Sequence, residues 1–332
     1  MKGLVTIFGG SGFIGSQIVR ALAKRDYRIR VAVRRPGLGY KLRMLGDVGQ
    51  VEIVQANIRM PASIARALDG AEAAVNCVAV IHETGRQKFQ SLHVMGARNI
   101  AEAASAAGVH RFVHISALGA SPEAHSKYGR SKAAGEAAVR QAFPAATIVR
   151  PSVVFGQNDH FFNRFASLAT FPSPIPPPLP LIGGGETLFQ PVFVGDVAGA
   201  VAAALADPAA LGATYELGGP GVHSFRELMV MMLAEIQRER LLLSIPFPLA
   251  GPIGWGGDAW LAVRGVLGFL PEPPITSDQI QMLRDDNVVA PGALGLADLG
   301  VTPTPMEPIL PTYLYPYRKG GQYAGLLAPA PR

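Results

Sequence analysis

The sequence is poor in cysteine, tryptophan and charge: its 332 residues include one cysteine, Cys77, two tryptophans and only 16% charged residues. A lone cysteine cannot form an internal disulfide, which excludes a secreted disulfide-stapled fold and favours a reducing compartment. The low charge and the apolar content of 49% argue against a disordered chain. A globular protein with a large buried core is therefore expected.

Long apolar runs free of proline are also missing. The uncharged stretch 165–185 contains six prolines, and the stretch 241–257 contains three. Because proline interrupts the helical hydrogen bonding that lipid requires, we expect no membrane span. The first predicted strand covers residues 3–8, so we also expect no signal or transit peptide.

Basic residues do not cluster with aromatic residues, so we expect no nucleic-acid partner. The chain nevertheless carries a formal net charge of +6. This charge is compatible with anionic lipid, an acidic protein surface or a phosphate-bearing small molecule, and we favour the last. We expect no metal site.

Short β-branched runs alternate with amphipathic stretches from residue 1 to about residue 150. LVTIFG, IRVAVR, VEIVQA, AAVNCVAV, RFVHIS and ATIVR predict strands, and FIGSQIVRALAKR, PASIARALDG, SLHVMGARNIAEAASAAG and SKYGRSKAAGEAAVRQAF predict helices. This alternation is typical of a parallel sheet covered on both faces. We predict an α/β fold: a Rossmann-type, doubly wound core over 1–150 and a smaller mixed lobe over 151–332, with 185–205 returning to the core.

The predicted lobe contains three notable segments. FPSPIPPPLPLIGGG, residues 171–185, predicts an extended connector, and the tail 302–332 predicts an extended arm. SFRELMVMMLAEIQRERLLL, residues 224–243, predicts a helix with a capping box of Ser224 and Glu227. One apolar stripe of that helix is predicted to face a core: Phe225, Leu228, Met229, Met232, Leu233 and Ile236.

The segment 247–274 carries Trp255 and Trp260 in an apolar setting. It suits a lipid interface or a groove on a partner, and it equally suits the core of the smaller lobe. The sequence leaves both interpretations open.

VTIFGGSGFIGSQIV places Gly9, Gly12 and Gly15 directly after a strand and at the opening of a helix. Side chains at the first two positions would hold a pyrophosphate away from the backbone, and the third glycine lets helix and strand pack closely. In this context the motif predicts a dinucleotide site.

The second strand ends in Arg34 and Arg35, where a carboxylate that binds the ribose of NAD would otherwise stand. Guanidinium groups there suit a 2′-phosphate, so NADP(H) is favoured over NAD(H). Asn57 and Ile58 follow the third strand, where a side chain could meet the adenine. Asn76 and Ala79 close the fourth strand near the expected dinucleotide path.

Tyr128 and Lys132 lie four residues apart on a predicted helix and project from one face. We expect the lysine charge to lower the pKa of the phenol and to hold the nicotinamide ribose, while the phenol exchanges a proton with a substrate. Such a pair usually works with a nearby serine hydroxyl.

These motifs, together with NIAEAASAAGVHRFVHIS, IVRPSVVFGQND, QPVFVGDVAGAV and YELGGP, resemble the short-chain dehydrogenase/reductase superfamily of the extended or atypical type, from residue 3 to about 220. Active members place Ser or Thr at the end of the fifth strand. In HISALG the best register puts Ala117 at that place, although Ser116 is available. The predicted cofactor contacts are Gly9, Gly12, Phe13, Ile14, Gly15, Arg34, Arg35, Asn57, Ile58, Ala79, Tyr128, Lys132 and Pro151.

SKYGRSKAAGE, IVRPSVVFGQNDHFFNRFA and QPVFVGDVA are similar to the nucleotide-binding accessory subunits of respiratory complex I. The resemblance implies tightly held NADPH, no established turnover and other complex I subunits as partners. It also implies a peripheral place near the membrane surface and the quinone site, which for a bacterial form is the cytoplasmic side of the inner membrane. Two alternatives stay open: an active NADP-dependent reductase or epimerase acting on a sugar-nucleotide, sterol or isoprenoid carbonyl, and an NADP-binding redox sensor.

Overall fold

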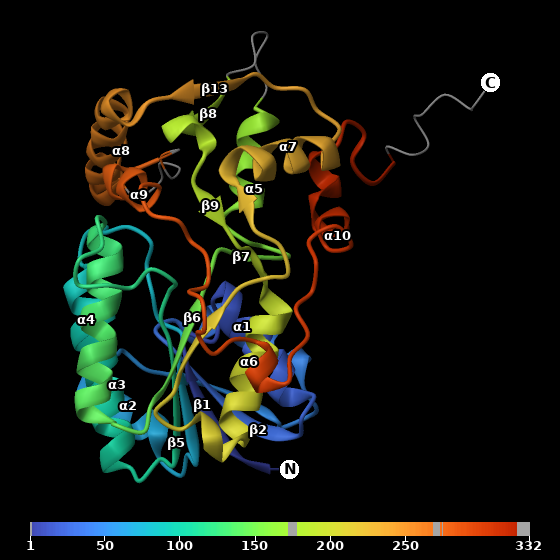
Figure 1. Ribbon diagram of the computed structural model, residues 1–332. Coiled ribbons are helices and arrows are strands. Elements are labelled where there is room, and N and C mark those ends of the chain that lie inside the picture. The colour runs from blue at the N-terminus through green and yellow to red at the C-terminus, as the bar shows by residue number, and fades with distance from the viewer. Residues whose placement is uncertain (1, 172–177, 268–272, 274, 324–332) are drawn as a thin grey trace.

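The computed structural model describes residues 2–171, 178–267, 273 and 275–323 (Figure 1). Seven parallel strands form the central sheet, in the order β11-β6-β5-β4-β1-β2-β3. Their bounds are β1 (Lys2–Phe8), β2 (Tyr27–Val33), β3 (Val51–Gln55), β4 (Ala73–Asn76), β5 (Arg111–Ile115), β6 (Thr147–Pro151) and β11 (Thr214–Leu217). The Rossmann-type fold predicted from the alternating pattern is confirmed.

Helices cover both faces of the sheet. One face carries α1 (Phe13–Ala23) and α6 (Val194–Ala206), and the other carries α2 (Pro61–Leu68), α3 (Met95–Ala106) and α4 (Lys127–Ala142). In β1, Val5 and Ile7 pack toward α1 and α6, whereas Phe8 packs with the opposite cluster. Since both faces are buried, the strands read as continuous apolar runs.

The smaller lobe lies at the end of the sheet where the strands finish (Figure 1). It contains β7 (Val154–Phe155), α5 (Phe162–Ala169), β8 (Leu179–Ile182), β9 (Leu188–Phe189), β10 (Val192–Phe193), β12 (His223–Ser224), α7 (Phe225–Glu235), β13 (Leu242–Ile245), α8 (Phe247–Leu267), α9 (Ser277–Met282) and α10 (Leu310–Leu314). Short helical turns are η1 (Pro36–Leu38), η2 (Tyr40–Leu45), η3 (Gln90–Val94), η4 (Gly183–Gly185), η5 (Pro208–Ala210), η6 (Ala297–Leu299), η7 (Tyr315–Tyr317) and η8 (Gly321–Tyr323).

The capping box of Ser224 and Glu227 is confirmed, and the predicted stripe of α7 is buried in the core of the lobe. The predicted extent of this helix is wrong, however. It ends at Glu235 because Gln237 adopts a left-handed backbone, with φ of 54°, and the amide of Arg238 bonds back to the carbonyl of Leu233. The following leucines form β13, which pairs in parallel with β8.

Two other boundaries differ from the sequence prediction. The fourth strand stops at Asn76, because the Asn76 side chain accepts a hydrogen bond from the amide of Val78 and turns the chain. The helix predicted from residue 91 opens with one wide turn, η3, before α3 begins at Met95.

Within the segment 247–274, residues Phe247–Leu267 form the long helix α8, which the sequence analysis did not predict. Trp255 is 70% exposed and Trp260 is 42% exposed, which places these rings on the surface of the lobe rather than in its core. Among the described residues, no helix is long and apolar enough to cross a membrane. Residues 268–272 and 274 lie outside the described part.

The proline-rich connector and the tail are only partly described. Residues 172–177 of the connector lie outside the described range, and 179–182 form β8. Within the tail, Leu310, Tyr313 and Leu314 of α10 are buried against the lobe, so the tail is not an extended arm there. Apolar side chains placed three and four residues apart in that turn explain the difference. Residues 324–332 lie outside the description.

Candidate dinucleotide site

All the strand-end residues predicted for the site lie along one edge of the sheet. Because the strands are parallel and adjacent, their carboxyl ends meet there, which is where doubly wound folds bind nucleotides. In strand order from β3 to β6, the residues brought to this edge are Asn57, Arg34, Gly9, Ala79, Ser116 and Pro151.

The glycine turn between β1 and α1 leaves its backbone uncovered. Gly9 has a left-handed backbone, with φ of +80°, and a Cβ there would lie 3.1 Å from the backbone of Cys77. A Cβ on Gly15 would lie 2.4 Å from the carbonyl oxygen of Gly9, so only glycine lets α1 approach the turn this closely. Gly12 caps α1, and no side chain among the described residues bonds to that cap, so the first amides of Phe13 and Ile14 remain available to a pyrophosphate.

Two exposed arginines follow β2. Arg34 donates from Nη2 to Oε1 of Gln87 at 3.2 Å, and Arg35 starts the turn η1. The sequence prediction missed a third guanidinium, that of Arg59, whose Nη1 donates to the carbonyl oxygen of Arg86 at 3.1 Å. Arg34 and Arg59 therefore both contact the segment 86–87, beside the predicted position of the adenosine phosphate.

The other strand-end residues have partly structural roles. Asn57 Oδ1 accepts from the amide of Arg59 at 3.1 Å, and Ile58 packs against Gly96. Asn76 is buried and donates to Nδ1 of His114 at 3.1 Å, whereas Ala79 is exposed. Asn76 therefore fixes the end of β4, and Ala79 is free to meet a ligand.

The opposite end of the site is built by β5 and α4. Lys132 is buried and donates from Nζ to the carbonyl oxygen of Ile115 at 2.8 Å. The next residue, Ser116, is 4% exposed, and its Oγ has no hydrogen-bond partner among the described residues. The structure thus places the Ser116 hydroxyl beside the strand end that Lys132 touches, while Ala117 brings no hydroxyl.

The titration of the Tyr–Lys pair differs from the sequence expectation. Burial lowers the pKa of Lys132 to about 8, against the opposing negative charge of Glu136. Burial also raises the pKa of Tyr128 to about 12. The expectation of a lowered pKa for the phenol is wrong, because burial disfavours the charged phenolate and raises the pKa.

The sequence prediction also missed His93, which supports Tyr128. His93 Nε2 accepts from the amide of Val80 at 3.0 Å, so Nδ1 carries the proton and donates to Ser131 Oγ at 2.8 Å. Ser131 Oγ then donates to the carbonyl oxygen of Tyr128 at 2.7 Å. Burial, aided by the charge of Lys132, lowers the pKa of His93 to about 3, so this imidazole is neutral. No spacing motif in the sequence marks it.

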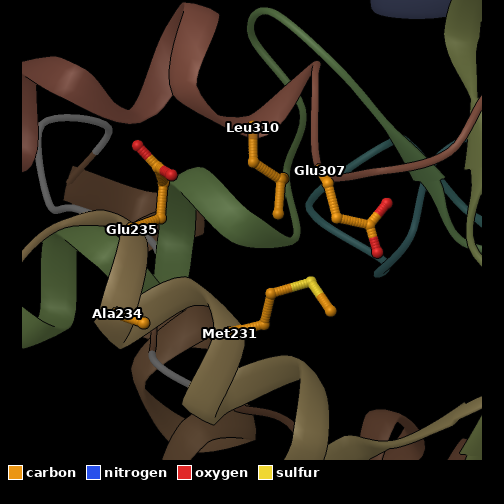
Figure 2. Close-up of a pocket in the computed structure, with 5 residues that line it drawn as sticks. All are labelled: Met231, Ala234, Glu235, Glu307 and Leu310. Atoms are coloured by element: carbon orange, nitrogen blue, oxygen red, sulfur yellow. The ribbon is translucent and has the colours of Figure 1, made fainter.

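A separate hollow of about 300 Å³ lies in the lobe between α7 and the start of α10 (Figure 2). Figure 2 shows Leu310 and Met231 pointing toward each other, with Glu235 and Glu307 on either side. Glu235 is already paired with Arg318. This hollow contains none of the predicted cofactor residues, and two carboxylates would repel a dinucleotide phosphate.

The chain has clear relatives. It is 36% identical over 333 residues to the NADH dehydrogenase (ubiquinone) 1 alpha subcomplex subunit 9, mitochondrial, of Arabidopsis thaliana, covering 98% of this chain and 81% of that protein. A shorter match, 40% identical over 158 residues and 48% of each chain, is to a ceramide reductase of Caulobacter vibrioides.

Among solved structures, a double mutant of DesIV, a dTDP-glucose 4,6-dehydratase from Streptomyces venezuelae with NAD and DAU bound, matches with a TM-score of 0.69. The match covers 98% of each chain at 20% identity, and at that identity it shows the fold alone. The model of the NAD dependent epimerase/dehydratase family matches residues 5–218, which include the glycine turn and all or part of each strand of the sheet. The chain belongs to the NAD dependent epimerase/dehydratase family and, within it, to the group that the subunit 9 proteins represent.

Proposed function

We propose that this protein is an NADPH-binding accessory subunit of proton-pumping respiratory complex I and has no independent turnover. The observation that carries the proposal is the similarity over 98% of the chain to a protein named as a subunit of NADH dehydrogenase. The preserved glycine turn supports a retained nucleotide, and the weakened Tyr–Lys end supports the loss of turnover.

The residues at the sheet edge fit NADPH rather than NADH. Backbone amides at the start of α1 would hold the pyrophosphate, and Arg34 and Arg35 would pair with the 2′-phosphate. Lys132 would hold the nicotinamide ribose, with Pro151 at the neighbouring strand end. When bound, the dinucleotide supplies a hydride donor.

The same end of the site explains why turnover is not proposed. A phenol whose pKa is raised to about 12 is a poorer proton donor near neutral pH than one lowered by an adjacent lysine. Ala117 also leaves the usual hydroxyl position without a donor. Loss of one such donor costs roughly 3–4 kcal/mol of transition-state stabilisation. The protein's own residues therefore bind and orient a dinucleotide better than they use it.

The proposed location is peripheral, on the cytoplasmic side of a bacterial inner membrane, in the arm near the quinone site. The exposed apolar side chains of α8, which include Leu249, Trp255 and Val263, support contact with a membrane surface or with a neighbouring subunit. The net charge of +6 is compatible with anionic headgroups.

The test is to tag the chain at its native level, solubilise membranes of the source cell in mild detergent and isolate the intact assembly. We expect the chain to run with complex I on a native gel and to release NADPH on denaturation. A purified complex I that lacks this polypeptide, or a chain that releases NADH instead, would contradict the proposal.

A second candidate is an active NADP-dependent reductase, and the unpartnered Ser116 hydroxyl favours it. A substrate carbonyl oxygen would give that hydroxyl its missing partner, and Tyr128 would protonate the same oxygen. The partial match to a ceramide reductase suggests a lipid carbonyl. This candidate predicts NADPH oxidation with a long-chain keto substrate that Tyr128→Phe abolishes. NADPH that stays bound and unoxidised across a panel of carbonyl compounds would count against it.

A further inference from the structure

The N-terminus of α4, the helix that carries Tyr128 and Lys132, is capped from two directions. The first amides of any helix lack partners inside it. Here the amide of Gly129 donates to Ser126 Oγ at 3.0 Å, a local cap. The amides of Lys127 and Tyr128 donate to the two carboxylate oxygens of Asp278, at 2.6 Å and 3.0 Å. The lobe therefore supplies two of the three capping bonds.

Asp278 is itself held in place by the short helix α9. Thr276 and Gln279 form a capping box at the start of α9, which fixes the turn that presents the carboxylate. A second contact joins the same two segments, because His125 Nδ1 lies 2.7 Å from Asp285 Oδ1. The carboxylate thus comes from a rigid turn and not from a loose loop.

The helix α8 fixes the position of α9 in turn. A Cβ on Gly254 would lie 2.7 Å from Ser277 Cα, and a Cβ on Gly257 would lie 1.9 Å from the carbonyl oxygen of Ile275. Asp258 accepts hydrogen bonds from both the amide and the hydroxyl of Ser277. Two close backbone approaches and a carboxylate cap leave α9 little freedom relative to α8.

The negative charge of Asp278 strengthens the cap of α4 and ties it to the backbone of Tyr128. A carboxylate at a helix N-terminus makes charge-assisted hydrogen bonds and interacts favourably with the helix dipole. The amide of Tyr128 is one of the donors, so a shift of Asp278 moves the backbone of Tyr128 directly. One turn later lies Lys132, whose ammonium bonds to the end of β5.

We propose that Asp278 is a positioning residue of the nucleotide site: through it the α8–α9 part of the lobe sets where Tyr128 and Lys132 stand against the nicotinamide end of the cofactor. This inference rests on the proposed binding of NADPH. It assigns to the lobe a part in cofactor binding, without any contact between Asp278 and the cofactor.

The experiment compares two ligands on the full chain. NADPH reaches both ends of the site, whereas 2′-phospho-ADP has the adenosine 2′-phosphate and the pyrophosphate but lacks both the nicotinamide and its ribose. For Asp278→Asn we expect the dissociation constant for NADPH to rise about tenfold and that for 2′-phospho-ADP to change less than about twofold. Asp278→Ala, which keeps no acceptor, is expected to show a larger rise for NADPH alone.

The matched control is Asp286→Asn. Asp286 lies in the same lobe and accepts from the amide of Leu188 at 2.8 Å, but this bond stays within the lobe. We expect that variant to bind both ligands as the wild type does. Thermal unfolding without ligand is measured for each variant, so that a folding defect is seen separately from a binding defect.

Three outcomes would overturn the inference. Unchanged NADPH binding by Asp278→Asn shows that the cap does not position the pair. An equal loss of affinity for both ligands shows that Asp278 has a merely structural role. If Asp278→Ala fails to fold, the milder variant Asp278→Asn still allows the comparison. Failure of the wild-type chain to bind NADPH overturns the proposed function together with this inference.

Discussion

The two ends of the nucleotide site are built differently. The phosphate end consists of bare backbone at Gly9 and Gly12 and of the exposed guanidinium groups of Arg34 and Arg35. The nicotinamide end consists of the buried Lys132 and a hydrogen-bonded chain of His93, Ser131 and Tyr128. Exposed arginines keep their charge and grip a phosphate, whereas burial pushes a phenol and an amine toward their neutral forms. Substitutions at the phosphate end can therefore change dinucleotide binding, and substitutions at the nicotinamide end can change reactivity, independently of each other.

The largest expected effect is at the glycine turn. Gly15→Val places carbon atoms on the carbonyl oxygen of Gly9, because even a Cβ there would lie 2.4 Å away. We expect NADPH binding to be lost and the free energy of unfolding to fall by about 1–3 kcal/mol. The control is Gly37→Ala, since a Cβ on Gly37 meets nothing within 4 Å. If Gly15→Val still binds NADPH in a calorimetric titration, the glycine turn is not part of the binding site.

The next effect concerns the charge of Lys132 at the other end. Burial lowers the pKa of Lys132 from its ordinary value of 10.5 to about 8 in the folded chain, so between these pH values the unfolded chain binds more protons. The free energy of unfolding of the wild type should therefore increase by roughly 3 kcal/mol as the pH is raised from about 8 to 10.5.

Lys132→Met removes this titration, so its stability between those pH values should rise less than that of the wild type. Chemical denaturation at several pH values measures the difference between the two profiles. Lys127→Met, at the exposed lysine of the same helix, is the control and should leave the wild-type profile unchanged. Parallel profiles for the wild type and Lys132→Met would show that Lys132 is solvated.

A smaller effect separates the two dinucleotides. Hydrogen bonds to charged groups contribute about 1.5–3 kcal/mol, so replacing both Arg34 and Arg35 by Ala should weaken NADPH binding by roughly 10- to 100-fold. NADH binding should hardly change. Arg28→Ala is the control, because Arg28 is exposed at the opposite end of β2. An equal loss for NADPH and NADH would place the 2′-phosphate elsewhere, with Arg59 as the next residue to replace.

The smallest expected effect is on the free energy of unfolding, when each of two buried serines is replaced by alanine. Ser116 Oγ has no partner among the described residues, whereas Ser152 Oγ donates to Asn287 Oδ1 at 2.7 Å. We expect Ser116→Ala to raise the free energy of unfolding by about 1 kcal/mol and Ser152→Ala to lower it by about 1 kcal/mol. A stability loss in Ser116→Ala, or a marked loss of NADPH affinity, would show that the hydroxyl has a partner and would favour the reductase candidate.

The sheet and the glycine turn could be predicted because their signals are local. Runs such as the one ending in Phe8 are buried on both faces, and the turn lies within a few residues of its strand. The end of α7 at Gln237 depends on a left-handed residue that is not glycine, which no propensity rule marks. The helix α8 was not predicted, because Pro248 and the interior Pro252 are residues that usually interrupt a helix.

The support of the nicotinamide end could not be predicted, for a different reason. Asp278 caps α4 across a separation of 150 residues in the chain, and His93 reaches Ser131 across 38. Such pairs leave no periodic trace in the sequence. The pKa of Tyr128 was also misjudged, because the desolvation that raises it depends on burial, which the spacing of Tyr and Lys does not reveal.

The order of strands has a consequence for biosynthesis. The edge strand β11 pairs with β6, and its other side bonds to residues near Leu294. During synthesis, β6 therefore leaves the ribosome well before β11 and the residues near Leu294. Until then the nascent chain presents an unpaired apolar edge, which is a template for aggregation. Chains truncated before Thr214 should accordingly be insoluble even though they contain the whole glycine turn, and expression of the nucleotide-binding half by itself should depend on chaperones.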